Sequence, residues 1–325
     1  MKQVLVTGGM GFIGSHFIRL ALNKHVDWHI INLDKLTYAG NPKNLSDLEG
    51  NERYEFVQGD ICDEKLVEEL ISRTDIVVHF AAESHVDRSI DSAHDFVQTN
   101  VQGTRTLLDA VRKADCELFF HVSTDEVYGS IKNGSFSENS PIQPNSPYAA
   151  SKASSDLLVL AYAETYKFPV IISRCGNNYG PNQFPEKVIP LFVTNLIEEK
   201  KVPLYGEGLN VRDWIYVEDH CLGIDLLIEK GIRGEVYNIG TSDELRNIDL
   251  TQKILKLFNL DDSWIERVED RLGHDFRYSL DFSKIEKLGF KPTCSFEEGI
   301  NKTIGWYKDN DDWWQPLKKD KFTIK

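Results

Sequence analysis

A glycine-rich segment close to the start of the chain constrains its fold more than any other feature. The sequence GGMGFIG, residues 8–14, follows the apolar run 4–6 after a single threonine and contains Gly8, Gly11 and Gly14. Because Gly8 and Gly11 lack side chains, a pyrophosphate can approach the backbone, and the N-terminus of the following helix offers unpaired N–H donors. A strand, this turn and a helix in this order predict a dinucleotide site. The alternative is a purely structural turn.

An acidic residue selects between the two common dinucleotides. Asp34 stands twenty residues after Gly14, at the end of the second predicted strand. A carboxylate in this place accepts hydrogen bonds from a ribose 2′-hydroxyl and repels a 2′-phosphate. The expected cofactor is therefore NAD rather than NADP, unless Asp34 is only a surface residue.

The first half of the chain alternates short β-branched or aromatic runs with longer amphipathic ones. This rhythm predicts βαβ units and an α/β fold with a doubly wound (Rossmann) parallel sheet. The predicted strands are residues 3–7, 29–34, 54–58, 76–80, 118–122 and 169–173, and the predicted helices are 12–23, 64–72, 95–113 and 147–166.

The regular alternation of strand-like and helical runs ends after residue 180, where the segment GPNQFPEKVIP contains three prolines. We expect residues 1–180 to form an NAD-binding domain and residues 181–325 to form mainly a smaller C-terminal α/β cap that binds a sugar nucleotide. Residues 211–240, with a helix over 217–229, are expected to return to the first domain. The aromatic and charged segment 306–321 is expected to be a docked tail.

Composition indicates an ordinary cytoplasmic enzyme. The formal net charge is −14, which argues against a nucleic-acid or membrane-surface partner, since either favours a basic face. The five cysteines include no C-x-x-C pair, so neither a zinc site nor a disulfide framework is expected, and no metal is expected. The longest apolar stretches fall well short of a membrane span.

A second motif points to redox chemistry. Tyr148 and Lys152 form Y-x-x-x-K, which places both side chains on one face of a helix. A nearby ammonium and the positive nicotinamide both favour tyrosinate and lower the phenol pKa toward neutrality. The tyrosine can then take a hydroxyl proton while a hydride leaves the same carbon. Alone, this spacing is mostly coincidence; Ser123 and Thr124, at the end of a strand, strengthen the functional interpretation.

Two carboxylates directly follow Thr124. An acid and a base side by side, Asp125 and Glu126, suit the removal of water across adjacent carbons: one protonates the departing hydroxyl, and the other abstracts a proton next to a carbonyl. Oxidation or epimerisation of an alcohol needs neither group. The alternative is a turn that begins with two acidic residues.

The motifs together resemble the extended short-chain dehydrogenase/reductases and, within them, the dTDP-glucose 4,6-dehydratase family. The resemblance covers essentially the whole chain and is carried by HFAAESHVDRSI (79–90), VSTDEVYGS (122–130), SPYAASKASSD (146–156), NNYGPNQFPEKVIPL (177–191), GLNVRDWIYVEDH (208–220) and DRLGHDFRYSLD (270–281). Three departures concern Leu272 in DRLGHD, Gly176 in CGNNYG, and the segment GTSDELRN; the first and last weaken the assignment of the nucleobase.

The resemblance implies roles for the matching positions. The catalytic residues would be Thr124, Asp125, Glu126, Tyr148 and Lys152. The NAD site would comprise Gly8, Gly11, Phe12, Ile13, Gly14, Asp34, Lys35, Leu36, Thr37, Asp60, Ile61, Phe80, Ala81, Ala82, Glu83, Ser84, Thr99, Tyr148, Lys152 and Asn178. Substrate contacts would come from Ser84, Thr124, Asn177, Lys187, Val188, Pro203, Leu204, Tyr205, Arg212, Asn247, Asp270, Arg271, Leu272, Gly273 and His274, with Arg212 and Arg271 on the diphosphate.

The implied reaction is a closed redox cycle that yields a 4-keto-6-deoxy sugar nucleotide for deoxysugar biosynthesis. Tyr148 takes the 4-hydroxyl proton while hydride leaves C4 and Thr124 holds the oxygen; Glu126 then removes the C5 proton, Asp125 protonates the C6 hydroxyl, and hydride returns to C6. NAD is regenerated and expected to stay bound. The family also suggests a homodimer formed through helices 95–113 and 147–166.

Three alternatives stay open at this point. The first is the same reaction on another nucleotide diphosphate glucose. The second is a nucleotide-sugar 4-epimerase or decarboxylase, which would not need Asp125 and Glu126. The third is a non-catalytic NAD-binding regulatory protein, which predicts decay at Tyr148, Lys152 or the acidic pair, and no such decay is seen.

Overall fold

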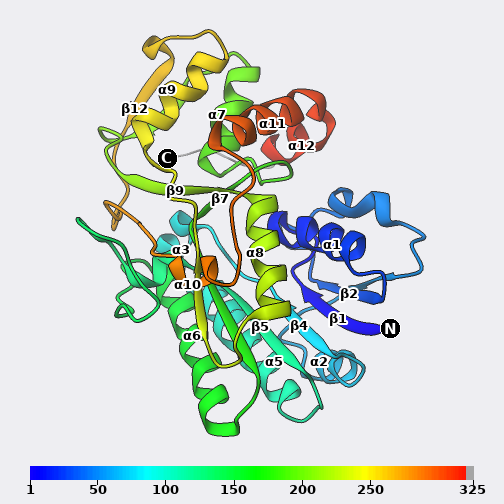
Figure 1. Ribbon diagram of the computed structural model, residues 1–325. Helices are drawn as coiled ribbons and strands as arrows, with labels where there is room; N and C mark the ends of the chain where they lie inside the picture. Colours follow the sequence, from blue (N-terminus) through cyan, green and yellow to red (C-terminus); the bar gives the residue numbers. More distant parts are fainter. Residues whose placement is uncertain (320–325) are drawn as a thin grey trace.

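A seven-stranded parallel sheet forms the centre of the computed structural model, which describes residues 1–319 (Figure 1). The strand order is β10-β6-β5-β4-β1-β2-β3, and every neighbouring pair is parallel. The order reverses beside β1, and in such sheets ligands bind at the carboxyl ends of the strands at this point. The strands are β1 (Lys2–Thr7), β2 (Trp28–Asp34), β3 (Tyr54–Gln58), β4 (Ile76–His79), β5 (Leu118–Thr124), β6 (Val170–Cys175) and β10 (Val236–Ile239).

Helices cover both faces of this sheet, so apolar residues that point to either face are buried in its central strands. In β1, Val4 and Val6 pack into the core cluster that includes α1 (Phe12–Lys24) and α8 (Val217–Lys230), whereas Leu5 points into the opposite cluster. That second cluster draws on α2 (Glu64–Ile71), α5 (Thr104–Val111) and α6 (Pro147–Tyr166). The predicted doubly wound fold is therefore confirmed.

The helix predicted over 95–113 is the clearest local difference from expectation. The segment consists of the short α4 (His94–Phe96), a π-helical turn η2 (Val97–Gly103) and α5, which ends at Val111. In the wide turn, Asn100 bonds the backbone of Glu83 through both side-chain atoms, at 2.9 and 3.0 Å. Periodicity alone does not reveal such a turn, which proteins often place beside functional sites.

The second half of the chain builds a smaller α/β layer above the carboxyl ends of the large sheet (Figure 1). Its core cluster gathers side chains from two small sheets and four helices. The sheets are β11-β9-β7 and β12-β8, made of β7 (Asn177–Tyr179), β8 (Val202–Tyr205), β9 (Val211–Tyr216), β11 (Glu244–Arg246) and β12 (Ile265–Val268). The helices are α7 (Val188–Ile197), α9 (Asn247–Leu257), α11 (Phe296–Asp309) and α12 (Asp311–Lys319).

The chain crosses between the two layers more than once. Within residues 211–240, α8 and β10 pack on or join the large sheet, whereas β9 pairs with β7 and β11 in the small one. A later segment returns as well, because α10 (Ser283–Glu286) buries Ile285 in the same core cluster as α1 and α8. The domain limits 1–180 and 181–325 stay a prediction.

The aromatic end of the chain is part of the fold. Trp314 is fully buried, and its Nε1 donates to the carbonyl oxygen of Tyr307 at 2.8 Å. Trp313 Nε1 donates to Asn44 Oδ1 at 2.9 Å, which attaches α12 to the first half of the chain. Residues 320–325 of the expected second domain lie outside the described part. Among residues 1–319, no helix combines the length and the apolar character that crossing a membrane requires.

Candidate active site

The glycine turn after β1 is closely packed. Gly8 has φ +74°, and a Cβ there would lie 2.6 Å from the backbone nitrogen of Ala81. A Cβ on Gly14 would lie 2.5 Å from the carbonyl oxygen of Gly8. Gly11 is the N-cap of α1 and provides no side-chain cap, so the first amides of the helix are not occupied by a capping side chain. This geometry fits a pyrophosphate on the helix N-terminus.

Asp34 organises the loop that follows β2. Its side chain is buried; Oδ2 accepts from the Met10 amide at 2.9 Å, and Oδ1 accepts from the Leu36 amide at 2.8 Å. Burial raises the pKa of Asp34, and these two amides oppose that rise. Beside it, Lys35 forms an ion pair with Asp60 at 2.7 Å. The ends of β2 and β3 thus bring together the side chains predicted to hold the adenosine half of NAD.

The remaining predicted NAD residues line the next strand ends. Residues 80–84 leave β4 and are held by Asn100 from the π-helical turn that also contains Thr99. On the other side, Asn178 Nδ2 donates to the carbonyl oxygen of Gly176 at 3.1 Å, and its Oδ1 lies 2.9 Å from Nδ1 of His220. His220 was not predicted; it orients the amide of Asn178 from α8.

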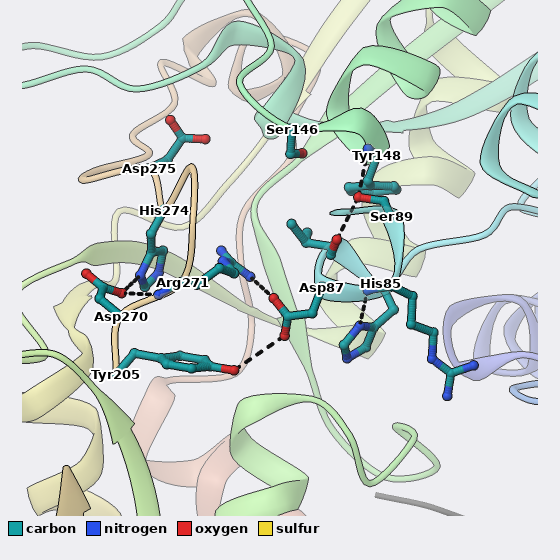
Figure 2. A network of polar contacts seen from close by, with 12 residues as sticks. His85, Asp87, Ser89, Ser146, Tyr148, Tyr205, Asp270, Arg271, His274 and Asp275 are labelled. Atoms are coloured by element: carbon teal, nitrogen blue, oxygen red, sulfur yellow. Dashed lines mark hydrogen bonds and ion pairs between the residues drawn. The ribbon is translucent and has the colours of Figure 1, made fainter. Parts of the chain in front are cut away.

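Helix α6 holds the predicted redox pair. The Tyr148 amide donates to Ser89 Oγ at 3.1 Å, so the first turn of α6 rests on α3 (Val86–Asp91), as Figure 2 shows. Lys152 Nζ, one turn further on, donates to the carbonyl oxygen of Val122 at 2.8 Å. The Tyr148 side chain is almost buried and is hydrogen-bonded to Thr124. The structure therefore brings the three predicted redox residues together.

The pKa of Tyr148 differs from the sequence-based expectation. Burial raises it, the carboxylates of Glu126 and Asp125 raise it further, and the bond with Thr124 opposes the rise. Burial also lowers the pKa of Lys152 to about 8. The protein alone thus favours the neutral phenol, because burial disfavours the charged tyrosinate.

The two carboxylates after Thr124 lie in different surroundings. They begin the short helix η3 (Asp125–Tyr128). Asp125 is 2% exposed, and its Oδ2 has no hydrogen-bond partner among the described residues. Burial and the Glu126 charge hold its pKa well above the usual range. Burial raises the pKa of Glu126 too, but Arg271, Arg212 and Lys187 act in the opposite direction. Two carboxyl groups with different surroundings therefore stand side by side, and their roles as acid and base stay a prediction.

Cationic side chains border the acidic pair. Arg212 Nη1 and Nη2 donate to the carbonyl oxygens of Val211 and Asp275 at 2.7 and 2.9 Å. Arg271 Nη1 lies 3.5 Å from Asp87 Oδ1, and the Tyr205 hydroxyl donates to the other oxygen of Asp87 at 3.4 Å (Figure 2). Asp87, like Ser89, was not predicted, although both lie inside the motif 79–90.

The match to known proteins agrees with this geometry. The family model described as GDP-mannose 4,6 dehydratase matches residues 5–303. A dTDP-glucose 4,6-dehydratase of Streptomyces antibioticus is 54% identical over 323 residues, which cover 98% of this chain and 96% of that protein. One from Streptomyces niveus is 51% identical over 97% of this chain and 96% of its own length. The chain belongs to the dTDP-glucose 4,6-dehydratase family.

A solved structure extends the likeness to three dimensions. DesIV, a dTDP-glucose 4,6-dehydratase from Streptomyces venezuelae crystallised with NAD bound, superposes with a TM-score of 0.95 at 54% identity. The alignment covers 97% of this chain and all of DesIV. The family resemblance that the motifs predict is thereby confirmed.

Two departures from the family pattern have structural explanations. A Cβ on Gly176 would lie 3.0 Å from the carbonyl oxygen of Asp213, so glycine fits where β9 passes close. The segment GTSDELRN contains β11, and its Glu244 pairs with Arg277 at 2.7 and 2.8 Å. The third, Leu272, is 77% exposed, and nothing in the structure explains it.

The other predicted substrate residues surround the same region. His274 Nδ1 lies 2.7 Å from Asp270 Oδ1, and Lys187 Nζ donates to the carbonyl oxygen of Ser84 at 2.7 Å. The rest begin helices, belong to β7 or β8, or lie in the loop after β12: Val188 begins α7, Asn247 begins α9, Asn177 belongs to β7, Pro203 and Leu204 belong to β8, and Gly273 has φ +62°. Whether they contact substrate stays a prediction.

Proposed function

We propose that the protein dehydrates dTDP-glucose to dTDP-4-keto-6-deoxyglucose, using NAD as an internal hydride carrier. Full-length relatives with this activity, at about half identical residues, support the reaction. The observation that carries the residue assignment is the acidic pair. Asp125 is buried, and one of its carboxyl oxygens has no hydrogen-bond partner among the described residues. Glu126 interacts with three cationic side chains, and both carboxyl groups lie close enough to Tyr148 to raise its pKa.

The glycine turn and the ends of β2 and β3 are proposed to hold NAD. The amides of α1 would bind the pyrophosphate, and Asp34 would accept from the adenosine ribose while its charge disfavours a 2′-phosphate. When bound, NAD supplies the chemistry of accepting a hydride and giving it back. Because the cycle leaves NAD unchanged, we expect it to stay bound between turnovers.

Tyr148 is proposed to remove the proton of the sugar 4-hydroxyl. Its ring is buried, and Thr124 is hydrogen-bonded to it, so both groups can reach one oxygen of the substrate. The surroundings raise the pKa of the phenol, so the base forms only when positive charge approaches the ring. The buried ammonium of Lys152 and the oxidised nicotinamide are the two sources of that charge.

Asp125 and Glu126 are proposed to remove water from C5 and C6 of the 4-keto sugar. The ketone acidifies C5–H, and the carboxylate of Glu126 would take that proton. The raised pKa of Asp125 favours its protonated carboxyl, which would donate to the leaving C6 hydroxyl. In this proposal Glu126 accepts the proton that leaves C5, and Asp125 donates the proton that joins the C6 hydroxyl.

The nucleotide is proposed to lie across β8, the loop 270–274 and the start of α9. Arg212 and Arg271 would bind the diphosphate, because a guanidinium offers paired donors to phosphate oxygens. Arg212 is held by two backbone carbonyls, so its orientation is set before substrate arrives. We place NAD binding mainly in residues 1–180 and nucleotide binding mainly in 181–325.

One assay tests this function. Purified protein is incubated separately with dTDP-, UDP-, CDP- and GDP-glucose, without added cofactor, and the products are examined by mass spectrometry. We expect loss of one water, fastest from dTDP-glucose, and a loss of water with Glu126→Gln that is slower by roughly 10²–10³. Products of unchanged mass would indicate an epimerase, and faster reaction of another nucleotide would overturn the choice of base.

We further propose that the protein is a cytoplasmic homodimer. The segments 95–113 and 147–166 lie next to each other on one face of the large sheet and expose Val97, Leu157 and Tyr166. Its cysteines are free, as the reducing cytoplasm favours. Sedimentation of the wild type and Leu157→Glu tests the dimer: we expect the mass of two chains, and a shift toward one chain in the variant. Cell fractionation tests the location.

A further inference from the structure

A buried carboxylate lies one helical turn beyond the redox pair. Asp156 follows Lys152 by four residues on α6 and is fully buried. Its Oδ2 accepts from Arg174 Nε on β6 at 2.9 Å, and its Oδ1 lies 3.4 Å from Nε2 of His121 on β5. Asp156 thus sits between α6 and the large sheet, on the side away from the substrate residues. No role follows for it from the reaction described above.

The same carboxylate lies beside the strand that receives the Lys152 ammonium. Lys152 Nζ donates to the carbonyl oxygen of Val122 at 2.8 Å. Asp156 Oδ1 lies 3.4 Å from Nε2 of His121, the residue that precedes Val122 on β5. A single carboxylate therefore lies one helical turn from the ammonium and next to the strand segment on which the ammonium rests.

One anion acts on Lys152. The described titratable groups that interact with Lys152 are His79 from β4, His121 from β5 and Asp156 from α6 itself. Tyr148 lies one turn before Lys152 on α6, and Arg174 from β6 and Tyr128 from η3 lie near Asp156. Burial lowers the pKa of His121 to about 4 and that of His79 well below its usual range, so both imidazoles are neutral near pH 7. Burial raises the pKa of both tyrosines, so the phenols are neutral as well.

We propose that Asp156 is a positioning residue for the oxidation step: it keeps Lys152 charged and seated on Val122, so that Tyr148 can act as the base. The proposal rests on the proposed function, because it concerns the step in which Tyr148 takes a proton. It adds a residue that is proposed to touch neither substrate nor NAD and to act through Lys152; its charge also raises the pKa of Tyr148, so the Lys152 titration is the readout that isolates the proposed effect.

The sign of the effect follows from electrostatics. Burial lowers the pKa of Lys152 to about 8, and Asp156 opposes that fall. The ammonium is therefore lost as pH rises through this pKa. Removing the negative charge of Asp156 should lower the pKa further, because a neighbouring opposite charge typically shifts a buried group by about one unit or more. The oxidation step should then fail at lower pH than in the wild type.

Asp156→Asn tests the proposal in the NAD-loaded enzyme. Rapid mixing with dTDP-glucose measures NADH formation across pH, and we expect the alkaline limb of its rate to move down by roughly one pH unit. A second readout does not depend on catalysis: isotope-labelled lysine, with the Lys152 signal assigned through its absence in Lys152→Arg, should titrate at correspondingly lower pH.

Tyr128→Phe is the matched control. It removes the hydrogen bond that the Tyr128 hydroxyl accepts from Arg174 Nη1 at 2.9 Å and the one that it donates to Asn238 Oδ1 at 2.8 Å, and it leaves the charge of Asp156 in place. We expect its alkaline limb to coincide with that of the wild type. An unmoved limb in Asp156→Asn, or an equal shift in both variants, would overturn the proposal. A wild type that forms no NADH would instead overturn the proposed function.

Asp156→Asn leaves the buried Arg174 without its carboxylate, and such a loss can prevent folding. The double variant Asp156→Asn with Arg174→Gln removes both charges and keeps two hydrogen-bonding side chains. Its Lys152 titration should also move to lower pH, because Asp156 is the charge that acts directly on Lys152. An unchanged Lys152 titration in this folded double variant would equally contradict the proposal.

Discussion

The two ends of the site are built in contrasting ways. Tyr148 and Lys152 lie on a long helix and are 8% and 5% exposed. The Tyr148 amide is hydrogen-bonded to Ser89, and the Lys152 ammonium is hydrogen-bonded to the backbone of Val122. Arg271 and Asp87, at the nucleotide end, keep 20% and 40% of their side chains exposed and meet at 3.5 Å. Hydride and proton transfer need fixed geometry, whereas a diphosphate must enter and leave. The comparison predicts large losses in rate at the first end and moderate losses in affinity at the second.

The largest effect is expected for Tyr148→Phe. The variant keeps the ring packing but lacks the base, so the first NADH formation should slow by roughly 10²–10⁴ while the thermal unfolding midpoint changes little. Single-turnover absorbance of NADH measures it. Near-normal NADH formation would show that another group takes the 4-hydroxyl proton.

Glu126→Gln should stop the cycle one step later, with a loss in turnover of roughly 10²–10³. Oxidation at C4 should largely persist, so bound NADH should build up, and exchange of C5–H with heavy water should become slow. Wild-type product, in contrast, should carry deuterium at C5. If Glu126→Gln stopped before NADH appeared, the proposed separation of oxidation from dehydration would fail.

Asp125→Asn should separate the acid from the base within the pair. C5 exchange should continue with Glu126 intact while loss of the C6 hydroxyl slows, again by roughly 10²–10³. Since the acid must be protonated, the elimination rate of the wild type should fall as pH rises through the raised pKa of Asp125. The rate of the variant should not show this fall. An unchanged pH profile in Asp125→Asn would assign the proton to another donor.

A smaller effect is expected at the nucleotide end. Arg271→Met should raise KM for dTDP-glucose by roughly 10- to 100-fold, since hydrogen bonds to a charged group contribute about 1.5–3 kcal/mol, and should change kcat less. Arg267→Met is the matched control, because Arg267 pairs with Glu207 on the surface at 3.1 Å. A loss mainly in kcat would place Arg271 with the catalytic groups and would break the comparison.

The smallest effect is expected at the cofactor ribose. Asp34→Ala should weaken NAD binding by roughly tenfold and narrow the preference for NAD over NADP. Because Asp34 also accepts two backbone amides, the variant loosens its loop, which weakens both dinucleotides. The ratio of the two affinities is therefore the relevant measurement. A wild type that binds both equally would contradict the assignment of Asp34.

The sequence alone determined the features that depend on residues close together in the chain. The glycine turn, Asp34 at the end of a strand, and the Tyr148–Lys152 spacing are short-range features. The helix predicted over 147–166 coincides with α6, which Ser146 caps and Pro147 begins. The same patterns missed the π-helical turn at 97–103, which depends on Asn100 meeting Glu83 across the fold.

The tertiary structure decided how two adjacent carboxylates differ. Asp125 and Glu126 are neighbours in sequence, and no local rule makes one the acid and the other the base. The proposed difference rests on Lys187 and Arg271, both distant in sequence, which act on Glu126, whereas Arg212 acts on both carboxyl groups and Asp125 has one oxygen without a hydrogen-bond partner among the described residues. The pKa of a buried group depends on desolvation and on charges a few ångströms away, and only the folded chain sets those distances.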